Sequence, residues 1–156
     1  MFKIKIICIG KFKEKEFSAL ERIYLKRLSP FAKVELIEIR EVGYGESEDL
    51  EKVKFKEAEL IAKHLDSRAV VILLEEKGAS KNSRDFASFI NRLGSLGQEI
   101  IFVLGGSLGV HSSLRGISNH QISLSPLTFT HNFARVLLEE QLYRTCTILS
   151  GKAYHK

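Results

Sequence analysis

The sequence has little cysteine, tryptophan or proline. Its two thiols, Cys8 and Cys146, stand far apart, tryptophan is absent, and there are two prolines. So few cysteines exclude a disulfide scaffold and a metal site built on several thiolates, and two lone thiols fit a reducing cytosol. Two prolines are too few for a proline-rich linker.

Long hydrophobic runs are also missing. The longest, residues 69–74 and 100–104, are far shorter than the ~20 apolar residues that a membrane-spanning helix needs. Lys3 and Lys5 interrupt the apolar start of the chain, which is too short for a signal peptide. The sequence therefore predicts a cytoplasmic protein.

Several motifs of cofactor binding and catalysis are absent. Residues 105–109 read G-G-x-x-G, and no acidic residue stands in 122–125, so the nicotinamide-binding fingerprint fails twice. No Walker Gly-Lys-Ser/Thr and no hydrolase G-x-S-x-G occurs. The five histidines lack metal-ligand spacing, and we expect His64 at the surface. The sequence thus predicts no metal.

The composition that is present belongs to a folded basic domain. The chain has 156 residues, of which 44% are hydrophobic and 28% charged. This length predicts one domain over residues 1–156. Lys and Arg number 24 against 19 Asp and Glu, a net charge of +5, which permits an anionic partner.

Hydrophobic periodicity predicts alternating strands and helices. The expected strands are 3–10, 34–40, 69–74, 100–104 and 121–124. The expected helices are 17–28, 50–65, 83–94, a short 112–117 and 131–145. On the second helix, we expect Leu50 on the apolar face and Glu57 in water. This order predicts an α/β fold, a parallel sheet with helices on both faces.

Three loops follow apolar strands and should meet at one edge of the sheet. They are residues 75–78, the glycine loop 105–109, and residues 125–130. Ligands of open parallel sheets bind beyond the carboxyl ends of the strands, and glycine lets a backbone approach a ligand closely. A plain connection between a strand and a helix is the alternative reading of the glycine loop and of residues 125–130.

The last residues mix cations with one aromatic ring. Tyr154 can stack on an exposed base, and Lys152 and Lys156 can meet phosphates. A frayed terminus is the alternative reading of this tail.

Three segments give the chain a family resemblance. They are the glycine loop 105–109, the segment L-S-P-L-T-F-T-H at 124–131, and residues 135–144 with the closing Tyr-His-Lys at 154–156. With them, the chain resembles the SPOUT-class RNA methyltransferases, specifically the small RlmH type, over essentially its whole length. The resemblance implies a SPOUT fold with a C-terminal trefoil knot. It also implies methylation of N3 of a pseudouridine in 23S (large-subunit) ribosomal RNA, on the assembled ribosome.

The resemblance implies S-adenosylmethionine as the cofactor. Its binding positions fall in the three loops already singled out: Leu74, Gly106, Ser125, Pro126, Leu127, Thr128, Phe129 and Thr130. The pair Ser107-Leu108 and Thr130 differ from residues common in the family, which leaves the cofactor affinity open.

The resemblance also suggests catalytic roles. His155, with His131 as a second candidate, would remove the N3 proton, Arg144 would stabilise charge on the base or hold a phosphate, and Tyr154 would pack on the base. Small SPOUT proteins are homodimers in which the tail of one subunit reaches the cofactor of the other.

Two other functions stay open at this stage. A SPOUT enzyme acting on transfer RNA would share the knot and the cofactor, and the tail at 154–156 argues against it. A ribosome-associated factor without catalysis would need no cofactor, and the intact cofactor loops argue against that.

Overall fold

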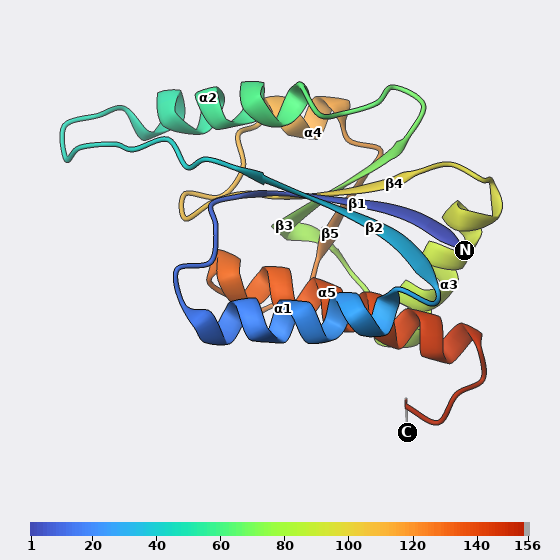
Figure 1. The fold of residues 1–156 in the computed structure, drawn as a ribbon. Helices are drawn as coiled ribbons and strands as arrows, with labels where there is room; N and C mark the ends of the chain where they lie inside the picture. Colours follow the sequence, from blue (N-terminus) through green and yellow to red (C-terminus); the bar gives the residue numbers. More distant parts are fainter. Residues whose placement is uncertain (155–156) are drawn as a thin grey trace.

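Five strands form one parallel sheet in the computed structural model, which describes residues 1–154. The strands are β1 (Phe2–Ile9), β2 (Ala32–Ile39), β3 (Val70–Ser80), β4 (Ile100–Leu104) and β5 (His120–Ser123). Their order across the sheet is β2-β1-β4-β3-β5, and each of these pairings is parallel. The predicted α/β fold and parallel sheet are confirmed (Figure 1).

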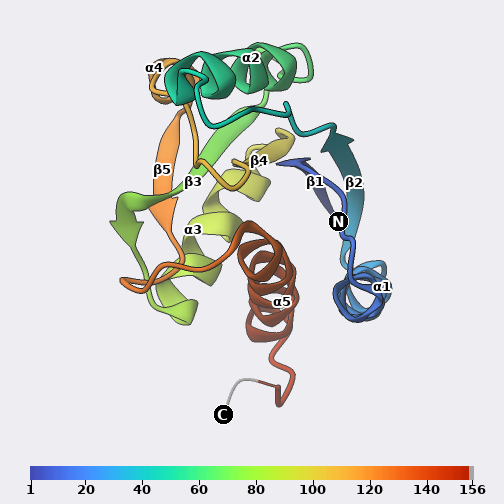
Figure 2. The same cartoon turned by 90° about the vertical axis from the view of Figure 1, so that its left-hand side faces the viewer.

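Helices cover both faces of the sheet, as predicted. One face carries α1 (Lys15–Leu28), α3 (Ser83–Ser95) and α5 (His131–Leu149), and the other carries α2 (Leu50–Ala62) and α4 (Ser113–Ile117). Figure 2 shows the two layers above and below the strands. Among residues 1–154, no helix has the length and apolar character needed to cross a bilayer.

The alternation of side chains along each strand fills two separate cores. On β1, Ile4 and Ile6 join the cluster under α1, α3 and α5, whereas Ile7 and Ile9 join the cluster under α2 and α4. All four side chains are almost fully buried. A central strand buried on both faces reads as a continuous apolar run, which is why the pattern predicted it well.

Helix α2 departs from its predicted faces. Leu50, expected on the apolar face, is 44% exposed. Glu57, expected in water, is buried, and its carboxylate accepts a hydrogen bond from the backbone N–H of Val42 at 3.2 Å. This bond makes the burial of Glu57 tolerable, because a buried polar group needs a partner.

A buried ionic cluster joins α5 to α1 and β2. Arg135 donates from Nε to Glu21 at 2.6 Å and from Nη2 to Glu38 at 2.9 Å. Glu139, one turn further along α5, is fully buried, and its carboxyl oxygens have no hydrogen-bond partner among residues 1–154. Burial and the nearby charge of Glu21 raise the pKa of Glu139 to about 9, so the carboxyl is protonated at neutral pH.

We expect Glu139 to make stability fall as the pH rises. Between about pH 5 and pH 9 the folded chain holds a proton on Glu139 that the unfolded chain has released, so stability falls by up to about 1.4 kcal/mol per pH unit. Glu139→Gln removes the titrating carboxyl. The free energy of unfolding, measured in urea at pH 6, 7 and 8, should then depend less on pH. Glu59→Gln, on an exposed position of α2, is the control and should leave the slope unchanged. A slope that persists in Glu139→Gln would contradict the assignment.

Candidate functional site

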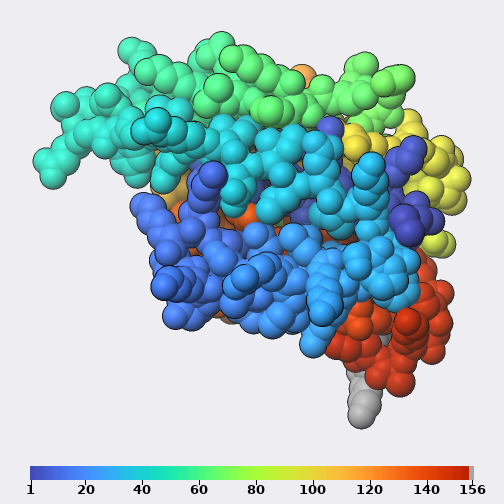
Figure 3. Space-filling view, viewed as in Figure 1, coloured from blue at the N-terminus to red at the C-terminus, as the bar shows by residue number. Residues whose placement is uncertain are grey.

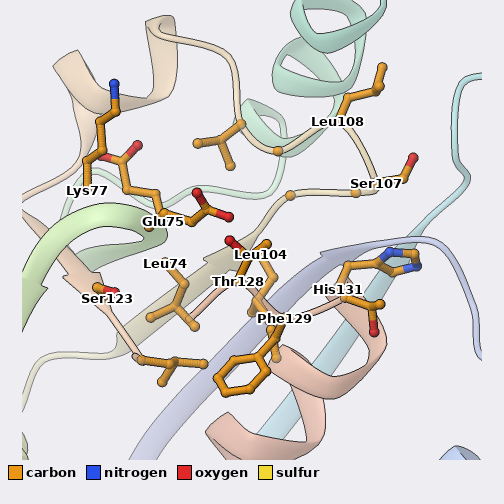
Figure 4. Close-up of a pocket in the computed structure, with 18 of the residues that line it drawn as sticks. Leu74, Glu75, Lys77, Leu104, Ser107, Leu108, Ser123, Thr128, Phe129 and His131 are labelled. Carbon is orange, nitrogen blue, oxygen red and sulfur yellow. The ribbon is translucent and has the colours of Figure 1, made fainter. Parts of the chain in front are cut away.

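A cavity of about 800 Å³ lies at the carboxyl edge of the sheet (Figure 4). All three loops singled out in the sequence contribute to its lining. Seven of the eight positions expected to bind a cofactor line it: Leu74, Gly106, Ser125, Leu127, Thr128, Phe129 and Thr130. Residues 75–78 were expected as a loop after the strand, but they are an extruded segment within β3, which runs on to Ser80. The site forms because β3, β4 and β5 run parallel, so this segment and the loops after β4 and β5 meet at one edge.

Pro126 is the exception among the eight positions. It is exposed and does not belong to the residues that line the cavity. Its neighbours Ser125 and Leu127 do line it. The proline shapes the loop, in which Ser125 Oγ accepts a hydrogen bond from the backbone N–H of Leu127 at 2.9 Å.

A bulge in β3 places charged residues at the cavity. Ile122 of β5 pairs with both Leu74 and Ala79, so residues 75–78 are extruded from the ladder. Such bulges re-aim side chains next to binding sites. Gly78 is required at this crossing, because a Cβ there would lie 2.5 Å from the carbonyl carbon of Ile122. The extruded residues include Glu75 and Lys77, which Figure 4 shows across the cavity from Leu108.

The glycine loop after β4 is a tight turn. The N–H of Gly109 donates to the carbonyl of Gly106 at 3.0 Å, and Gly109 has a φ of +77°. A Cβ on Gly105 would lie 2.5 Å from the carbonyl oxygen of Gly109, so the turn closes only with glycine at this position. The loop therefore brings bare backbone to the wall of the cavity.

The connection between β2 and α2 supports the glycine loop. Ser107 of the glycine loop donates a hydrogen bond to Glu41 at 3.1 Å, and buried Glu57 accepts one from the N–H of Val42. These two bonds fix the start of the connection next to the glycine loop. Burial raises the pKa of Glu57 above its ordinary value. The rest of the connection projects beyond the body of the molecule, at the left of Figure 3.

Capping fixes the loop that leads into α5. Thr130 is the N-cap of this helix, and its hydroxyl accepts from the N–H of Phe133 at 3.4 Å. Ser123 donates to the carbonyl of Ser125 at 2.8 Å. His131, the first residue of α5, lines the cavity together with Thr128 and Phe129 (Figure 4).

The cavity suits a nucleoside-like ligand. Leu74, Leu104 and Phe129 supply apolar walls, and the irregular loops supply backbone donors and acceptors. Within residues 1–154, no group of His, Cys, Asp and Glu side chains is arranged to hold a metal ion. The thiols of Cys8 and Cys146 are buried, and burial raises their pKa values to about 12 and about 11, so neither is a nucleophile.

Arg144 and Tyr154 lie away from the cavity. Neither belongs to the residues that line it. Arg144 stands thirteen positions after His131 on α5, which is about 20 Å along the helix axis at 1.5 Å per residue. His155, the expected proton acceptor, lies outside the described residues. Within residues 1–154 of one chain, Arg144 and Tyr154 are therefore not brought to the cavity, whereas His131 lines it.

Glu140 holds the tail against α5. Its carboxylate accepts hydrogen bonds from Arg144 and from the hydroxyl of Tyr154, the latter at 3.2 Å. The Arg144 guanidinium carbon lies 4.8 Å from the Tyr154 ring centre, and the Tyr143 ring meets the same ring edge-on. Burial, together with the charge of Glu140, raises the pKa of Tyr154 to about 12. Tyr154 is thus a positioned donor at the end of the helix.

The sequence placed Glu75 in a candidate ligand loop but predicted no partner for it. Glu57 was expected in water, and no role was predicted for Arg115 or Glu140, because nothing in the local pattern distinguishes these three. The partners of Arg115, Glu57 and Glu140 are 40, 15 and 14 positions away, so only the fold shows them.

Comparisons with known proteins give consistent results. A family model described as "Predicted SPOUT methyltransferase" matches residues 2–155. Ribosomal RNA large subunit methyltransferase H of Caldicellulosiruptor saccharolyticus is 41% identical over 98% of this chain and 99% of its own. The proteins of that name from Clostridium tetani and Desulforamulus reducens are 40% and 39% identical, over 98% and 100% of this chain and 99% and 100% of theirs.

Proposed function

The chain belongs to the SPOUT methyltransferase family, and we propose that it transfers a methyl group from S-adenosylmethionine to N3 of a pseudouridine in 23S ribosomal RNA. The observation that carries this proposal is the meeting of the three family loops at one cavity. The substrate is supported by three relatives, about 40% identical over their full length, whose name is ribosomal RNA large subunit methyltransferase H.

The cavity has the size and the donor set for the cofactor. Leu74, Leu104 and Phe129 would enclose the adenine base, and the backbone of Gly106 and of residues 125–130 would bind its polar edge. Bound there, S-adenosylmethionine supplies a methyl group activated by a sulfonium. The protein's task is then to hold the acceptor nitrogen in line behind that methyl group.

The acceptor nitrogen carries a proton that must leave. His155 is the proposed proton acceptor, with His131 at the cavity as the second candidate. Arg144 presents a forked set of donors that would stabilise negative charge on the base oxygens. Tyr154 would pack on the base, held in place by Glu140 and Arg144.

A homodimer would unite the two halves of the site. In one chain about 15 Å of helix separates Arg144 from Ala134, the nearest residue of α5 that lines the cavity, so the tail of a second copy is proposed to complete it. An apolar surface is available on neighbouring helices. Leu20 and Ile23 of α1 and Phe133 of α5 are between 41% and 53% exposed, and Phe17 meets Phe133 edge-on at 5.0 Å.

Basic side chains support contact with RNA. Lys11, Lys13 and Lys15 are exposed just after β1, at the edge of the sheet that carries the cavity. The net charge of +5 favours a polyanion. A ribosomal substrate places the protein in the cytoplasm.

The trefoil knot and the single domain 1–156 complete the proposal. The extruded segment of β3 lies against Ile122 of β5 so closely that only Gly78 fits. The following loop 125–130 lies at the same cavity as the glycine loop. In the proposed knot, the C-terminal segment would be threaded past the glycine loop and loop 125–130, which is consistent with both loops lying at one cavity.

Transfer of a labelled methyl group to ribosomes tests this function. Ribosomes from a strain that lacks the target pseudouridine are the matched control, because they carry uridine at that site. We expect labelling of 23S RNA in the first and little in the second. Equal labelling of both would refute the pseudouridine preference. Labelling of transfer RNA alone would favour the tRNA enzyme, and no binding of S-adenosylhomocysteine in calorimetry would favour the non-catalytic factor.

A further inference from the structure

Glu75 is a largely buried carboxylate in the wall of the cavity. Its side chain is 7% exposed and forms an ion pair with Arg115. It follows Leu74, at the point where the bulge in β3 begins. Figure 4 shows it beside Leu74, on the far side of the cavity from Ser107 and Leu108. A buried charge needs compensation, so its partners define what else it can bind.

Arg115 of α4 holds this carboxylate in a fixed orientation. Its Nε donates to Oε1 at 3.2 Å and to Oε2 at 2.8 Å, and its Nη2 lies 2.8 Å from Oε2. Arg115 supplies every hydrogen bond recorded for Glu75 within residues 1–154. A carboxylate offers about four lone-pair positions, so acceptor capacity is left over. Arg115 itself is 45% exposed, so the pair is anchored from the solvent side.

The position matches a known way of binding ribose. Glu75 stands directly after Leu74, the last residue of β3 that pairs with β4, and the glycine loop follows Leu104, the partner of Leu74 on β4. In dinucleotide folds, an acidic residue at a strand end near a glycine loop accepts hydrogen bonds from ribose hydroxyls. Two adjacent hydroxyls match the two oxygens of one carboxylate.

The charges around Glu75 favour a neutral partner. Arg115 already balances its charge, Lys54 is paired with Glu51, and Lys77 is accompanied in the lining by Glu76. The charges near Glu75 are thus already balanced, and a hydroxyl adds no further charge. The carboxylate is therefore suited to a neutral diol.

We propose that Glu75 accepts hydrogen bonds from the vicinal ribose hydroxyls of the cofactor, and that Arg115 positions the carboxylate for this contact. This inference rests on the proposed function. It makes Glu75 a specificity residue that selects a ribonucleoside over a deoxyribonucleoside ligand. The chemistry of methyl transfer is not assigned to it.

Calorimetry with S-adenosylhomocysteine and its 2′,3′-dideoxy analogue tests the proposal. We expect the wild-type chain to bind the ribose form about tenfold or more tightly, because hydrogen bonds to a charged group are among the stronger ones. Glu75→Gln should reduce this preference at least about threefold, since the amide is uncharged and offers one acceptor in place of two. Glu46→Gln, in the projecting β2–α2 connection, is the control and should keep the full preference.

The outcomes separate this proposal from the proposed function. A wild-type chain that binds both ligands equally would overturn the role of Glu75 without any variant, so a folding defect of Glu75→Gln cannot hide the answer. An unchanged preference in a folded Glu75→Gln would overturn it too. If Glu75→Gln weakens S-adenosylhomocysteine but not methylthioadenosine, which lacks the amino acid part, the contact is to the ammonium and the proposal is wrong. A wild-type chain that binds none of these ligands would contradict the proposed function, and this proposal with it.

Discussion

Gly105→Ala should weaken the binding of S-adenosylhomocysteine by at least about 100-fold, close to 2.7 kcal/mol. A Cβ on Gly105 would lie 2.5 Å and 2.6 Å from the carbonyl oxygen and carbon of Gly109, and 2.9 Å from Val110. Two of these contacts are to backbone, so no side chain can rotate away. The turn must open, and the wall of the cavity moves with it. Isothermal titration calorimetry measures the loss.

Gly45→Ala is the matched control for this substitution. Gly45 lies in the β2–α2 connection, its added Cβ would meet nothing within 4 Å, and its φ is not in the left-handed region. The same methyl group there should leave binding unchanged. If Gly105→Ala binds within threefold of the wild-type chain, the glycine loop is a plain turn and not part of the cofactor site.

Arg144→Ala should lower methyl transfer to ribosomes on the order of 100- to 1000-fold, the size of effect seen when a charge-stabilising donor is removed. Binding of S-adenosylhomocysteine should stay within about twofold, because the proposed contact of Arg144 is to the base of the RNA and not to the cofactor. The methyl transfer of Arg144→Lys should lie between that of the wild-type chain and that of Arg144→Ala, since lysine keeps the charge but loses the forked geometry. Single-turnover labelling and calorimetry separate the two effects.

Arg22→Ala controls for the loss of a cation. Arg22 is exposed on α1, where its side chain contacts the carbonyl of Ser18 in the same helix. This variant should keep nearly full activity. An Arg144→Ala chain that retains more than a tenth of wild-type activity would remove Arg144 from the proposed chemistry and leave it as a partner of Glu140.

The strands and the site edge could be predicted because burial leaves a clear pattern. Ile100–Leu104 is apolar without interruption, as a strand covered on both faces must be, and the structure gives it the predicted bounds. The alternation of strands and helices predicts a parallel sheet, and a parallel sheet brings the segments after its strands to one edge. Seven of the eight expected cofactor positions line the cavity in the structure.

Tertiary contacts decided what the local pattern could not. Helix α5 was expected to end at residue 145 but runs to Leu149, because Thr145, Cys146 and Thr147 are buried and the packing outweighs the low helix propensity of threonine. Asn82 caps α3, because its side chain accepts a hydrogen bond from the N–H of Asp85. Burial of Glu57 depends on Val42, which is fifteen residues away.

The proposed catalytic residues raise a different difficulty. Arg144 and Tyr154 lie at the opposite end of α5 from His131, and Glu140 binds both. A single chain cannot reveal a site that two chains would share. The family resemblance implies a site shared by two chains. The spacing along α5 requires such a shared site if the cavity and the tail take part in one reaction.

A heterodimer of two inactive variants tests the shared site most directly. One subunit carries Gly105→Ala and lacks a working cavity, the other carries Arg144→Ala and lacks a working tail, and separate affinity tags isolate the mixed dimer. If the tail of one subunit serves the cavity of the other, one of the two sites contains only intact parts. The mixed dimer should then recover about half of the wild-type methyl transfer per dimer. Activity as low as that of each variant alone, in a mixed dimer shown to be intact, would contradict the shared site.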